Sequence, residues 1–203
     1  MKLHIGAGMS PLSGWTNVDL VPYPGIDAVL DVTRGLPFEQ VEFIFAEHFL
    51  EHLPLVDGLR FLRECRRVLT DDGIMRISTP NLDWVWLTHY KQPADMTDDE
   101  QFLGCLELNR AFHGWGHRFL YNLPMLLLTL NRSGFSTFVS CEYGRSTHAN
   151  LTELERHELS QGLPSAPSVL IVEASGRSGR DGSDELKSFE TMIAPYVRDF
   201  GTT

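Results

Sequence analysis

Leu3-His-Ile-Gly-Ala-Gly8 opens the chain, and Gly14-Trp-Thr-Asn-Val-Asp19 follows it closely. Each stretch contains a short apolar run typical of a buried strand. Gly6 and Gly8 come directly after the first run, and Asp19 ends the second. Glycine lets a backbone approach a ligand closely, and open α/β sheets bind ligands beyond the carboxyl ends of their strands. The two stretches therefore predict an α/β sheet with a ligand site at this edge.

The rest of the chain continues the alternation of strands and helices. A helical pattern is expected over residues 55–69. Further strands are expected at residues 28–32, 42–46, 74–78, 135–142 and 168–174. Strands separated by crossovers predict a doubly wound, Rossmann-like sheet, here of seven mostly parallel strands.

Residues 82–118 interrupt this rhythm with many aromatic residues and an acidic segment at 95–100. We interpret them as a helical lid inserted into a domain that spans residues 1–175. Residues 176–203 then form a flexible linker, rich in Gly and Ser, followed by a C-terminal amphipathic helix. That helix is expected either to pack on the domain or to form a homodimer.

Composition narrows the class of protein. A chain of 203 residues with 42% hydrophobic residues suits one domain with a proper core. The net charge of −10 argues against a broad nucleic-acid or anionic-membrane surface. The three cysteines form no CxxC pair, and the longest apolar stretch, at residues 123–130, is too short to span a bilayer. With no signal-peptide pattern at its start, a soluble cytoplasmic protein is expected.

Each of the first four strands is followed by a polar side chain or, after the first strand, by the glycines already named. Asp19 can accept hydrogen bonds from both hydroxyls of a ribose, and Asp31 can accept one from an adenine amine. Glu47 and His48 follow the fourth strand. Four such features in order favour a nucleoside-containing ligand. Asp31 has a structural alternative, because it also suits the cap of a helical turn that begins at Thr33.

These stretches resemble the class I S-adenosylmethionine-dependent methyltransferases. They are most similar to the small, type-11-like predicted methyltransferases that are often linked to cell-envelope polysaccharide synthesis. The resemblance spans about residues 2–174 and is densest before residue 81. It continues through Leu36-Pro-Phe38, Phe49-Leu-Glu-His-Leu53, Leu62-Arg-Glu-Cys-Arg-Arg-Val-Leu69 and Pro80-Asn81, with fainter matches at His117-Arg118-x-x-Tyr121 and Gly134-Phe135.

The resemblance implies a set of residues that bind the cofactor, S-adenosyl-L-methionine. Its members are Gly6, Ala7 and Gly8 near the methionine part, Asp19 at the ribose, Asp31 and Leu36 at the adenine, and Glu47 and His48 near the methyl group. In this interpretation Glu51 and His52 begin the next helix and have a structural role, and no metal is bound.

The chain also departs from the family pattern. Ser10 stands where a third glycine is usual, and only ten residues separate Gly8 from Asp19, too few for the usual helix. A dinucleotide needs a helix N-terminus under its pyrophosphate, whereas S-adenosylmethionine carries no phosphate. These departures therefore weigh more against a nicotinamide cofactor than against a methyltransferase.

Two other classes of protein stay open. His48-x-x-Glu51-His52 spells the H-x-x-E-H pattern of some zinc metallopeptidases. That site needs one uninterrupted helix for both histidines, and Pro54 together with the strand-like residues 44–46 argues against it. The other class is a catalytically silent module that binds the cofactor without turnover.

Methyl transfer to an oxygen acceptor can use a general base, for which an imidazole is suited near neutral pH. His48, His113 and His117 are the candidates. His117, which follows the expected lid, is the preferred one, with Tyr121 orienting the acceptor. The pair His113 and His117 could instead form a metal loop, although the two glycines between them argue against a helix. The acceptor is expected to be a small molecule or a saccharide.

Overall fold

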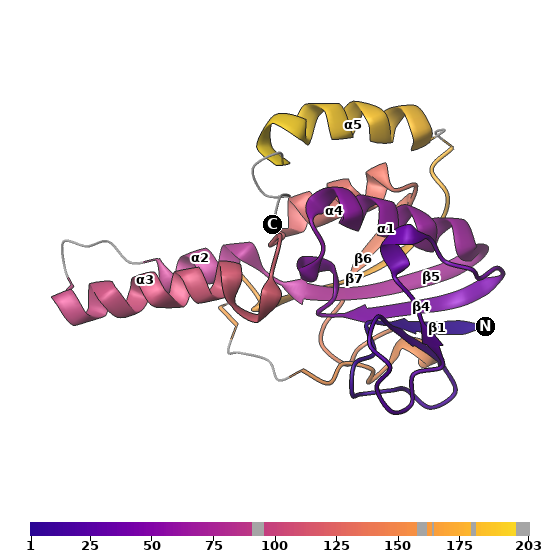
Figure 1. Ribbon diagram of the computed structural model, residues 1–203, viewed down its shortest axis with the longest axis horizontal. Coiled ribbons are helices and arrows are strands. Elements are labelled where there is room, and N and C mark those ends of the chain that lie inside the picture. Colours follow the sequence, from indigo (N-terminus) through magenta and orange to yellow (C-terminus); the bar gives the residue numbers. More distant parts are fainter. Residues whose placement is uncertain (91–95, 158–161, 164, 180–181, 198–203) are drawn as a thin grey trace.

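The computed structural model describes residues 1–90, 96–157, 162–163, 165–179 and 182–197 (Figure 1). Its seven strands form one sheet in the order β3-β2-β1-β4-β5-β7-β6. The strands are β1 (Lys2–Ile5), β2 (Thr16–Asp19), β3 (Ala28–Val29), β4 (Val41–Glu47), β5 (Leu69–Pro80), β6 (Thr137–Ser140) and β7 (Val169–Ser175). β7 pairs antiparallel with both β5 and β6, and the other four strand pairs are parallel. The predicted Rossmann-like, mostly parallel sheet of seven strands is confirmed.

Three strands differ clearly in length from the expectation. β6 is shorter than the expected 135–142. β3 holds only two residues, because Asp31 already caps the short 3-10 helix η1 (Val32–Arg34). β5 begins at Leu69, five residues before the expected start. Leu69 pairs with Val41 and Ile74 with Phe43, so a bulge in β5 accommodates the polar residues between them. The sheet thereby keeps its register in the apolar part of β5.

Helices cover one face of the sheet. The helices α1 (Leu55–Val68), α4 (Leu123–Arg132) and α5 (Gly182–Val197) contact one another above it (Figure 1). The main core lies beneath them and includes Leu3, Ile44, Leu62 and Met75, all fully buried. Phe189 and Ile193 of α5 are also buried in this core. The C-terminal helix is therefore packed on the domain, although the side chains of Leu186 and Val197 lie outside the described set.

Irregular segments cover the opposite face. Leu12 and Trp15, from the loop between β1 and β2, pack there with Leu151 and Leu154 against Phe45. The ten residues between Gly8 and Asp19 form no helix. Arg76 of β5 fixes the covering segment through buried ion pairs with Glu155 and Glu173. Folded loops therefore occupy the place that a helix after β1 would fill.

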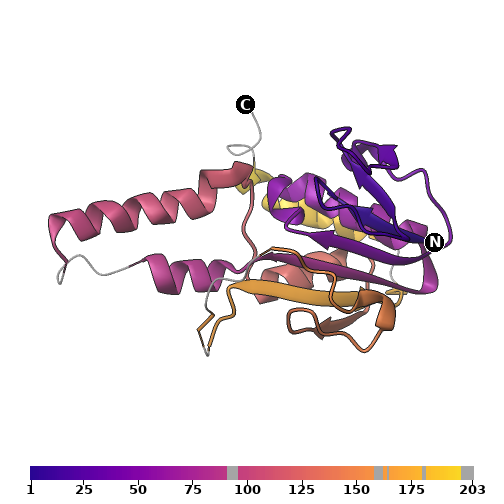
Figure 2. The ribbon, with the colours of Figure 1, turned by 90° about the horizontal axis from the view of Figure 1, so that it is seen from below.

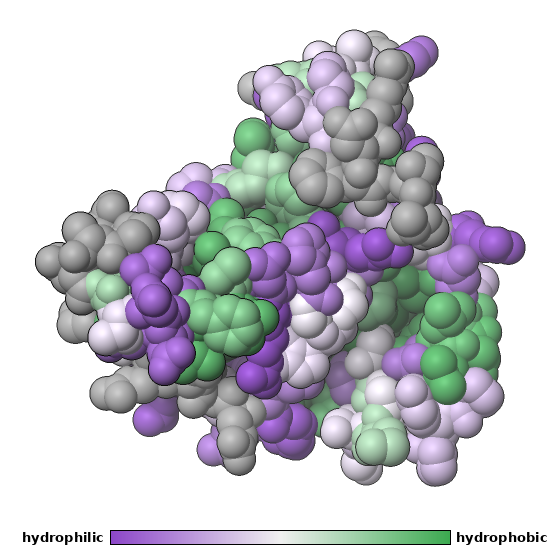
Figure 3. All heavy atoms as spheres, turned by 60° about the vertical axis from the view of Figure 1, so that its left-hand side comes forward, coloured by the Kyte–Doolittle hydropathy of each residue, from purple (hydrophilic) through white to green (hydrophobic). Residues whose placement is uncertain are grey.

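Residues 82–90 and 96–118 form an arm that lies outside the main core. α2 (Leu82–His89) and α3 (Asp98–His113) pack as a helical hairpin that projects from the carboxyl end of β5 (Figure 1, Figure 2). Thr97 and Glu100 form a capping box at the start of α3. The hairpin keeps several large apolar side chains exposed, and apolar surface is visible on this side of the molecule (Figure 3). The described helices include none long and apolar enough to cross a membrane.

Candidate functional site

The loop after β1 is held against the end of β2. The Gly8 amide donates to Asp19 Oδ2 at 2.9 Å, and the Val21 amide donates to Asp19 Oδ1 at 2.9 Å. Both Gly6 and Gly8 have positive φ, a conformation that glycine adopts without steric cost. Each carboxylate oxygen of Asp19 accepts one backbone N–H and keeps a further lone pair for a ligand. The structure thus brings together Gly6, Ala7, Gly8 and Asp19, as the sequence predicted.

Gly6 also meets the segment after β4. A β-carbon on Gly6 would lie 2.5 Å from Cδ2 of Phe49, so only glycine leaves room for this ring. Phe49 packs edge-on against Phe61 of α1, with ring centroids 5.0 Å apart. The loop after β1 and the segment 48–52 therefore adjoin at one edge of the sheet.

Asp31 is engaged in local contacts. Its Oδ1 accepts hydrogen bonds from the Thr33 amide and hydroxyl, and Arg34 lies 3.0 Å from Oδ2. The hydrogen bond from the Thr33 side chain is the main reason that the pKa of Asp31 is lowered. The alternative role as a cap is thus formed, and an adenine contact by this partly exposed carboxylate stays a prediction. Leu36 is buried in the core beside η1.

Glu47 lies buried at the end of β4 and holds another segment of the chain. Its carboxylate accepts hydrogen bonds from the amides of Arg156 and His157 at 2.9 to 3.1 Å. His157 Nδ1 lies 3.2 Å from Glu47 Oε2. These contacts are structural, so a role of Glu47 in lining the methyl region stays a prediction. Through them Glu47 positions His157, which the sequence analysis did not single out.

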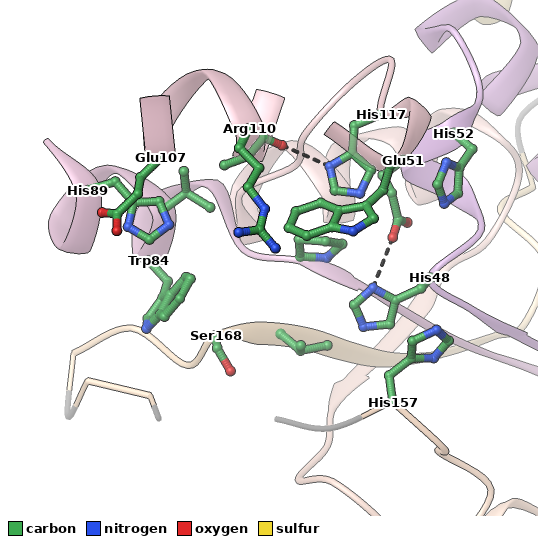
Figure 4. A pocket seen from close by; sticks show the side chains of 15 residues that line it. His48, Glu51, His52, Trp84, His89, Glu107, Arg110, His117, His157 and Ser168 are labelled. Atoms are coloured by element: carbon green, nitrogen blue, oxygen red, sulfur yellow. Dashed lines mark hydrogen bonds and ion pairs between the residues drawn. The ribbon is translucent and has the colours of Figure 1, made fainter. Parts of the chain in front are cut away.

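A cavity of about 530 Å³ lies between the carboxyl ends of β4 and β5 and the base of the arm (Figure 4). At one end of it lie the groups most suited to acid–base chemistry, which are the carboxylate of Glu51 and the imidazole rings of His48, His52 and His117. Its lining includes His48, Glu51, His52, Trp84, His89, Glu107, Arg110, Trp115, His117, His157 and Ser168. A volume of this size suits a small ligand.

His48 and Glu51 face each other in this cavity. His48 adopts a left-handed conformation, with φ of 46°, directly after β4. Such strain in a residue other than glycine is often found at functional sites. His48 Nδ1 lies 3.1 Å from Glu51 Oε1, at ion-pair distance although the pair lacks hydrogen-bond geometry. The ring of His48 also lies next to that of His157, with centroids 4.5 Å apart.

Glu51 and His52 were expected to be structural, yet both line the cavity. They lie in the 3-10 helix η2 (Leu50–His52), and α1 begins only after Pro54. This local break turns the carboxylate and the imidazole toward the cavity instead of along a helix. No single helix carries both His48 and His52, so the described residues do not form the metallopeptidase arrangement that H-x-x-E-H requires.

His117 points into the cavity from the end of the arm (Figure 4). Its Nδ1 lies 2.8 Å from the carbonyl oxygen of Ala111 and must therefore carry the proton that it donates. Nε2 is then left with a free lone pair. Its ring lies 5.3 Å from that of His52, measured between centroids.

His113 and Tyr121, two other candidates, lie elsewhere. His113 is exposed and does not line the cavity, so it forms no metal loop with His117. Tyr121 is fully buried in the main core, and its hydroxyl has no hydrogen-bond partner among the described residues. Burial, with a contribution from Glu51, raises the pKa of Tyr121 well above its usual value. This position fits a structural role better than the predicted orientation of an acceptor.

Aromatic and charged side chains form the other walls of the cavity. Trp115 has φ of 55°, and its ring lies 4.4 Å below the guanidinium carbon of Arg110. Trp84 faces His89 edge-on, with ring centroids 5.4 Å apart. Tryptophan faces bind planar and sugar rings well, and Arg110 and Glu107 add polar groups beside them.

Comparisons with known proteins agree with this architecture. A family model described as "Methyltransferase domain" matches residues 18–77, from β2 into β5. This match supports the predicted recognition as a methyltransferase over these residues. The matched segment includes Asp19 and Asp31, whereas Gly6 and Gly8 precede it and the arm follows it. No curated protein matches the chain.

Solved structures of similar fold are distant in sequence. A Thermotoga maritima protein, described as an S-adenosylmethionine-dependent methyltransferase and possible histamine N-methyltransferase, is 16% identical with a TM-score of 0.55; the match covers 87% of this chain and 81% of that one. For DhpI, solved with S-adenosylhomocysteine, the identity is 14% and the TM-score 0.52, with 88% and 77% covered. PigF, also solved with S-adenosylhomocysteine, is 17% identical with a TM-score of 0.51, and the match covers 86% of this chain but only 55% of PigF. These likenesses establish the fold.

Proposed function

We propose that this chain, an S-adenosylmethionine-dependent methyltransferase, transfers the methyl group to a small-molecule or saccharide acceptor held in the cavity beside His117. The observation that carries the proposal is the junction at Gly6 and Phe49. At this junction the loop of Gly6 to Gly8, which is bound to Asp19, lies next to the segment after β4. That segment contributes His48 and Glu51 to the cavity wall. A cofactor at the first and an acceptor at the second would therefore be neighbours.

The residues at the ends of β1 and β2 fit the cofactor. The positive φ of Gly8 and the open space beside it leave room for a ligand, and the lone pairs of Asp19 suit the two hydroxyls of a ribose. When bound, S-adenosylmethionine supplies a methyl group that its positively charged sulfur has already activated. That two similar structures were solved with S-adenosylhomocysteine supports the same assignment.

The residues of the cavity then have to bind and orient the acceptor. In-line transfer depends chiefly on alignment of the acceptor atom. Trp84 and Trp115 offer faces for a ring, and Arg110 offers N–H donors. The free lone pair on His117 Nε2 suits a hydrogen bond from an acceptor hydroxyl, whose proton it can accept as the new bond forms. His48 is the second imidazole at the same end.

The saccharide class is the finer part of the proposal. Two tryptophans near polar groups are what a sugar ring requires, since its hydrogens pack on an aromatic face and its hydroxyls need hydrogen bonds. The resemblance to enzymes of cell-envelope polysaccharide synthesis points in the same direction. Such an acceptor, and a cytoplasmic location with access to nucleotide-linked sugars, are parts of this proposal.

Calorimetric titration with S-adenosylhomocysteine tests the cofactor site. Asp19→Asn is expected to weaken binding roughly 10- to 100-fold, because a charged hydrogen-bond acceptor is lost. Asp72→Asn is the matched control. Asp72 is exposed at the start of β5, at the opposite edge of the sheet, and should leave binding unchanged. Absence of any binding by the unaltered protein would refute the proposed function.

A panel of acceptors with radiolabelled S-adenosylmethionine tests the transfer itself. Labelled product that is lost in His117→Ala, with cofactor binding retained, would support the role of this imidazole. If the cofactor binds and no member of a broad panel of hydroxylated small molecules and saccharides is methylated, the catalytically silent module is the better account.

A further inference from the structure

The cavity contains a group of side chains of the kind that bind metal ions. One ligand atom each from Glu51, His52 and His117 lie within 4.8 Å of one another. The three residues come from two distant parts of the chain, η2 and the end of the arm. We propose that Glu51, His52 and His117 bind a divalent transition-metal ion of the zinc class.

The burial of Glu51 is the first argument. Its side chain is fully buried, yet within the described part of the chain only the Thr79 hydroxyl donates a hydrogen bond to it, to Oε2 at 3.0 Å. Oε1 has no hydrogen-bond donor among the described residues, although His48 Nδ1 lies 3.1 Å from it without hydrogen-bond geometry. A buried carboxylate with so few partners is costly. A cation at the cavity side of Glu51 would offset that cost.

The protonation of His117 is the second argument. A histidine that binds a metal through one nitrogen usually donates the other N–H to a carbonyl or a carboxylate, which fixes the ring. His117 Nδ1 makes this contact with the carbonyl oxygen of Ala111 at 2.8 Å. Its Nε2 is left as the ligand atom. Thr79 serves Glu51 in the same way, as an outer partner that holds the carboxylate.

The backbone brings the ligands together without the ion. The carbonyl oxygen of Glu51 accepts hydrogen bonds from the amides of Arg118 at 2.7 Å and Phe119 at 3.1 Å. The end of the arm is thereby fixed to η2, next to the residue that carries the carboxylate. Gly116, with φ of 80°, turns the chain just before His117, where a β-carbon would come within 3.7 Å of His52 Nδ1. The arrangement is part of the fold and not a chance meeting of surface side chains.

The ligand types select the class of metal. Two imidazoles and one carboxylate are the ligands of zinc sites that keep an open position, and of related iron and cobalt sites. Magnesium and calcium prefer oxygen ligands only. The separation of 4.8 Å is wider than in a filled site, where bonds of about 2.0 Å bring ligands closer. The side chains would therefore close around the ion by rotating.

The position of the site indicates its use, and this step rests on the proposed function. Because the three ligands lie in the cavity wall, the open positions of the ion face the cavity. A hydroxyl of the acceptor would bind to the ion at one of these positions. It would then contact the ion instead of donating a hydrogen bond to His117 Nε2, which would itself bind the ion. The metal site itself does not depend on methyl transfer.

The experiment uses the full chain without an affinity tag, freed of metal with a chelator. Co²⁺ is added while visible absorption is recorded, and Zn²⁺ affinity is measured against a chromophoric chelator. We expect one ion per chain and the absorption of Co²⁺ bound to nitrogen ligands. His52→Ala and His117→Ala should each weaken Zn²⁺ binding by on the order of 100-fold or more, beyond the effect of losing an outer partner.

Two histidines serve as matched controls. His113 is exposed on the same stretch as His117, and His89 lines the far end of the same cavity (Figure 4). His113→Ala and His89→Ala should retain the affinity of the unaltered protein. The proposal is overturned if the unaltered protein binds no Zn²⁺, or if His52→Ala and His117→Ala bind as tightly as the controls.

Titration with S-adenosylhomocysteine on the same samples separates this proposal from the proposed function. Retained cofactor binding in His52→Ala and His117→Ala shows that these variants are folded. Zinc binding without cofactor binding would contradict the proposed function alone, and cofactor binding without zinc binding would contradict the metal site alone.

Discussion

Gly6 and Phe49 occupy adjoining space in which no side chain on residue 6 fits, since its β-carbon would lie 2.5 Å from the ring. This contact joins the proposed cofactor side of the site, formed after β1 and β2, to the cavity side, formed after β4. The sequence motif Gly6-Ala7-Gly8 thus has a packing role in addition to the ligand-binding role proposed for it.

Replacement of Gly6 by alanine should therefore destabilise the protein and weaken binding of S-adenosylhomocysteine. Gly14→Ala is the control, because Gly14 has a similar φ of 76° but open space around it. The left-handed backbone alone costs an alanine about 1–2 kcal/mol. Thermal unfolding should show a clearly larger loss for Gly6→Ala. Equal losses of stability in the two variants would mean that the Phe49 ring can move away from the new methyl group without an energetic cost.

Thr79→Val removes a hydroxyl that donates a hydrogen bond to Glu51. We expect a loss of stability of about 1–3 kcal/mol, because the buried carboxylate loses a partner, and a loss of zinc affinity of roughly 10- to 100-fold. Thr129→Val, which removes an equally buried hydroxyl in α4, should cost stability and leave zinc affinity unchanged. Denaturant unfolding and the chelator competition measure the two effects.

Arg76→Met should destabilise the protein by about 3–5 kcal/mol, because it leaves Glu155 and Glu173 buried without their cation. The segment that carries Glu155 also carries His157, so the position of His157 in the cavity wall should be disturbed. Arg60→Met, which breaks a half-exposed pair with Asp57, should cost less than about 1 kcal/mol. Urea unfolding of both variants tests the difference; similar losses would contradict the account of this face.

The stability of the protein should fall on acidification below the usual pKa of histidine, in part because of His4. Burial lowers the pKa of His4 below its ordinary value of 6.5, with opposing contributions that include its hydrogen bond to Asn17. Below pH 6.5 the unfolded chain therefore binds a proton at His4 that the folded chain does not. The free energy of unfolding falls as the pH drops from 6.5 to the lowered pKa, and this contribution levels off below it. Above pH 6.5 this contribution is constant. His4→Gln should flatten the dependence between these limits, as measured by urea unfolding from pH 5 to 8, whereas an unchanged slope would assign the effect to other groups.

Trp115→Ala should raise the KM for the acceptor, because it removes a wall of the cavity, and leave the affinity for S-adenosylhomocysteine unchanged. Trp86→Ala is the matched control. Trp86 lies on the same arm, is about half exposed at 49%, and stacks on Tyr90 outside the lining of this cavity. Steady-state kinetics of both variants would decide whether the arm contacts the acceptor. An equal effect of the two changes would indicate a general role of the arm in stability.

The sequence by itself determined the fold class and placed the residues of the proposed cofactor site at one edge of the sheet. Short apolar runs define strands locally, and Gly6, Gly8 and Asp19 follow their strands directly, so that the parallel register brings them together without further information. The spacing between Gly8 and Asp19 also indicated correctly that no helix separates the first two strands. The contact of Asp31 with Thr33 matches the capping alternative that the sequence offered. In contrast, no motif revealed the contact of Glu47 with the amide of Arg156, which lies far away in the sequence.

Only the tertiary structure decided how the cavity proposed to hold the acceptor is formed. His52 and His117 lie 65 positions apart in the sequence, and their approach depends on hydrogen bonds from the arm to the backbone of Glu51. Pro54 delays the start of α1, which turns Glu51 and His52 into the cavity although helical spacing would have made them structural. Such contacts arise from the packing of distant segments, for which a sequence pattern carries no local signal.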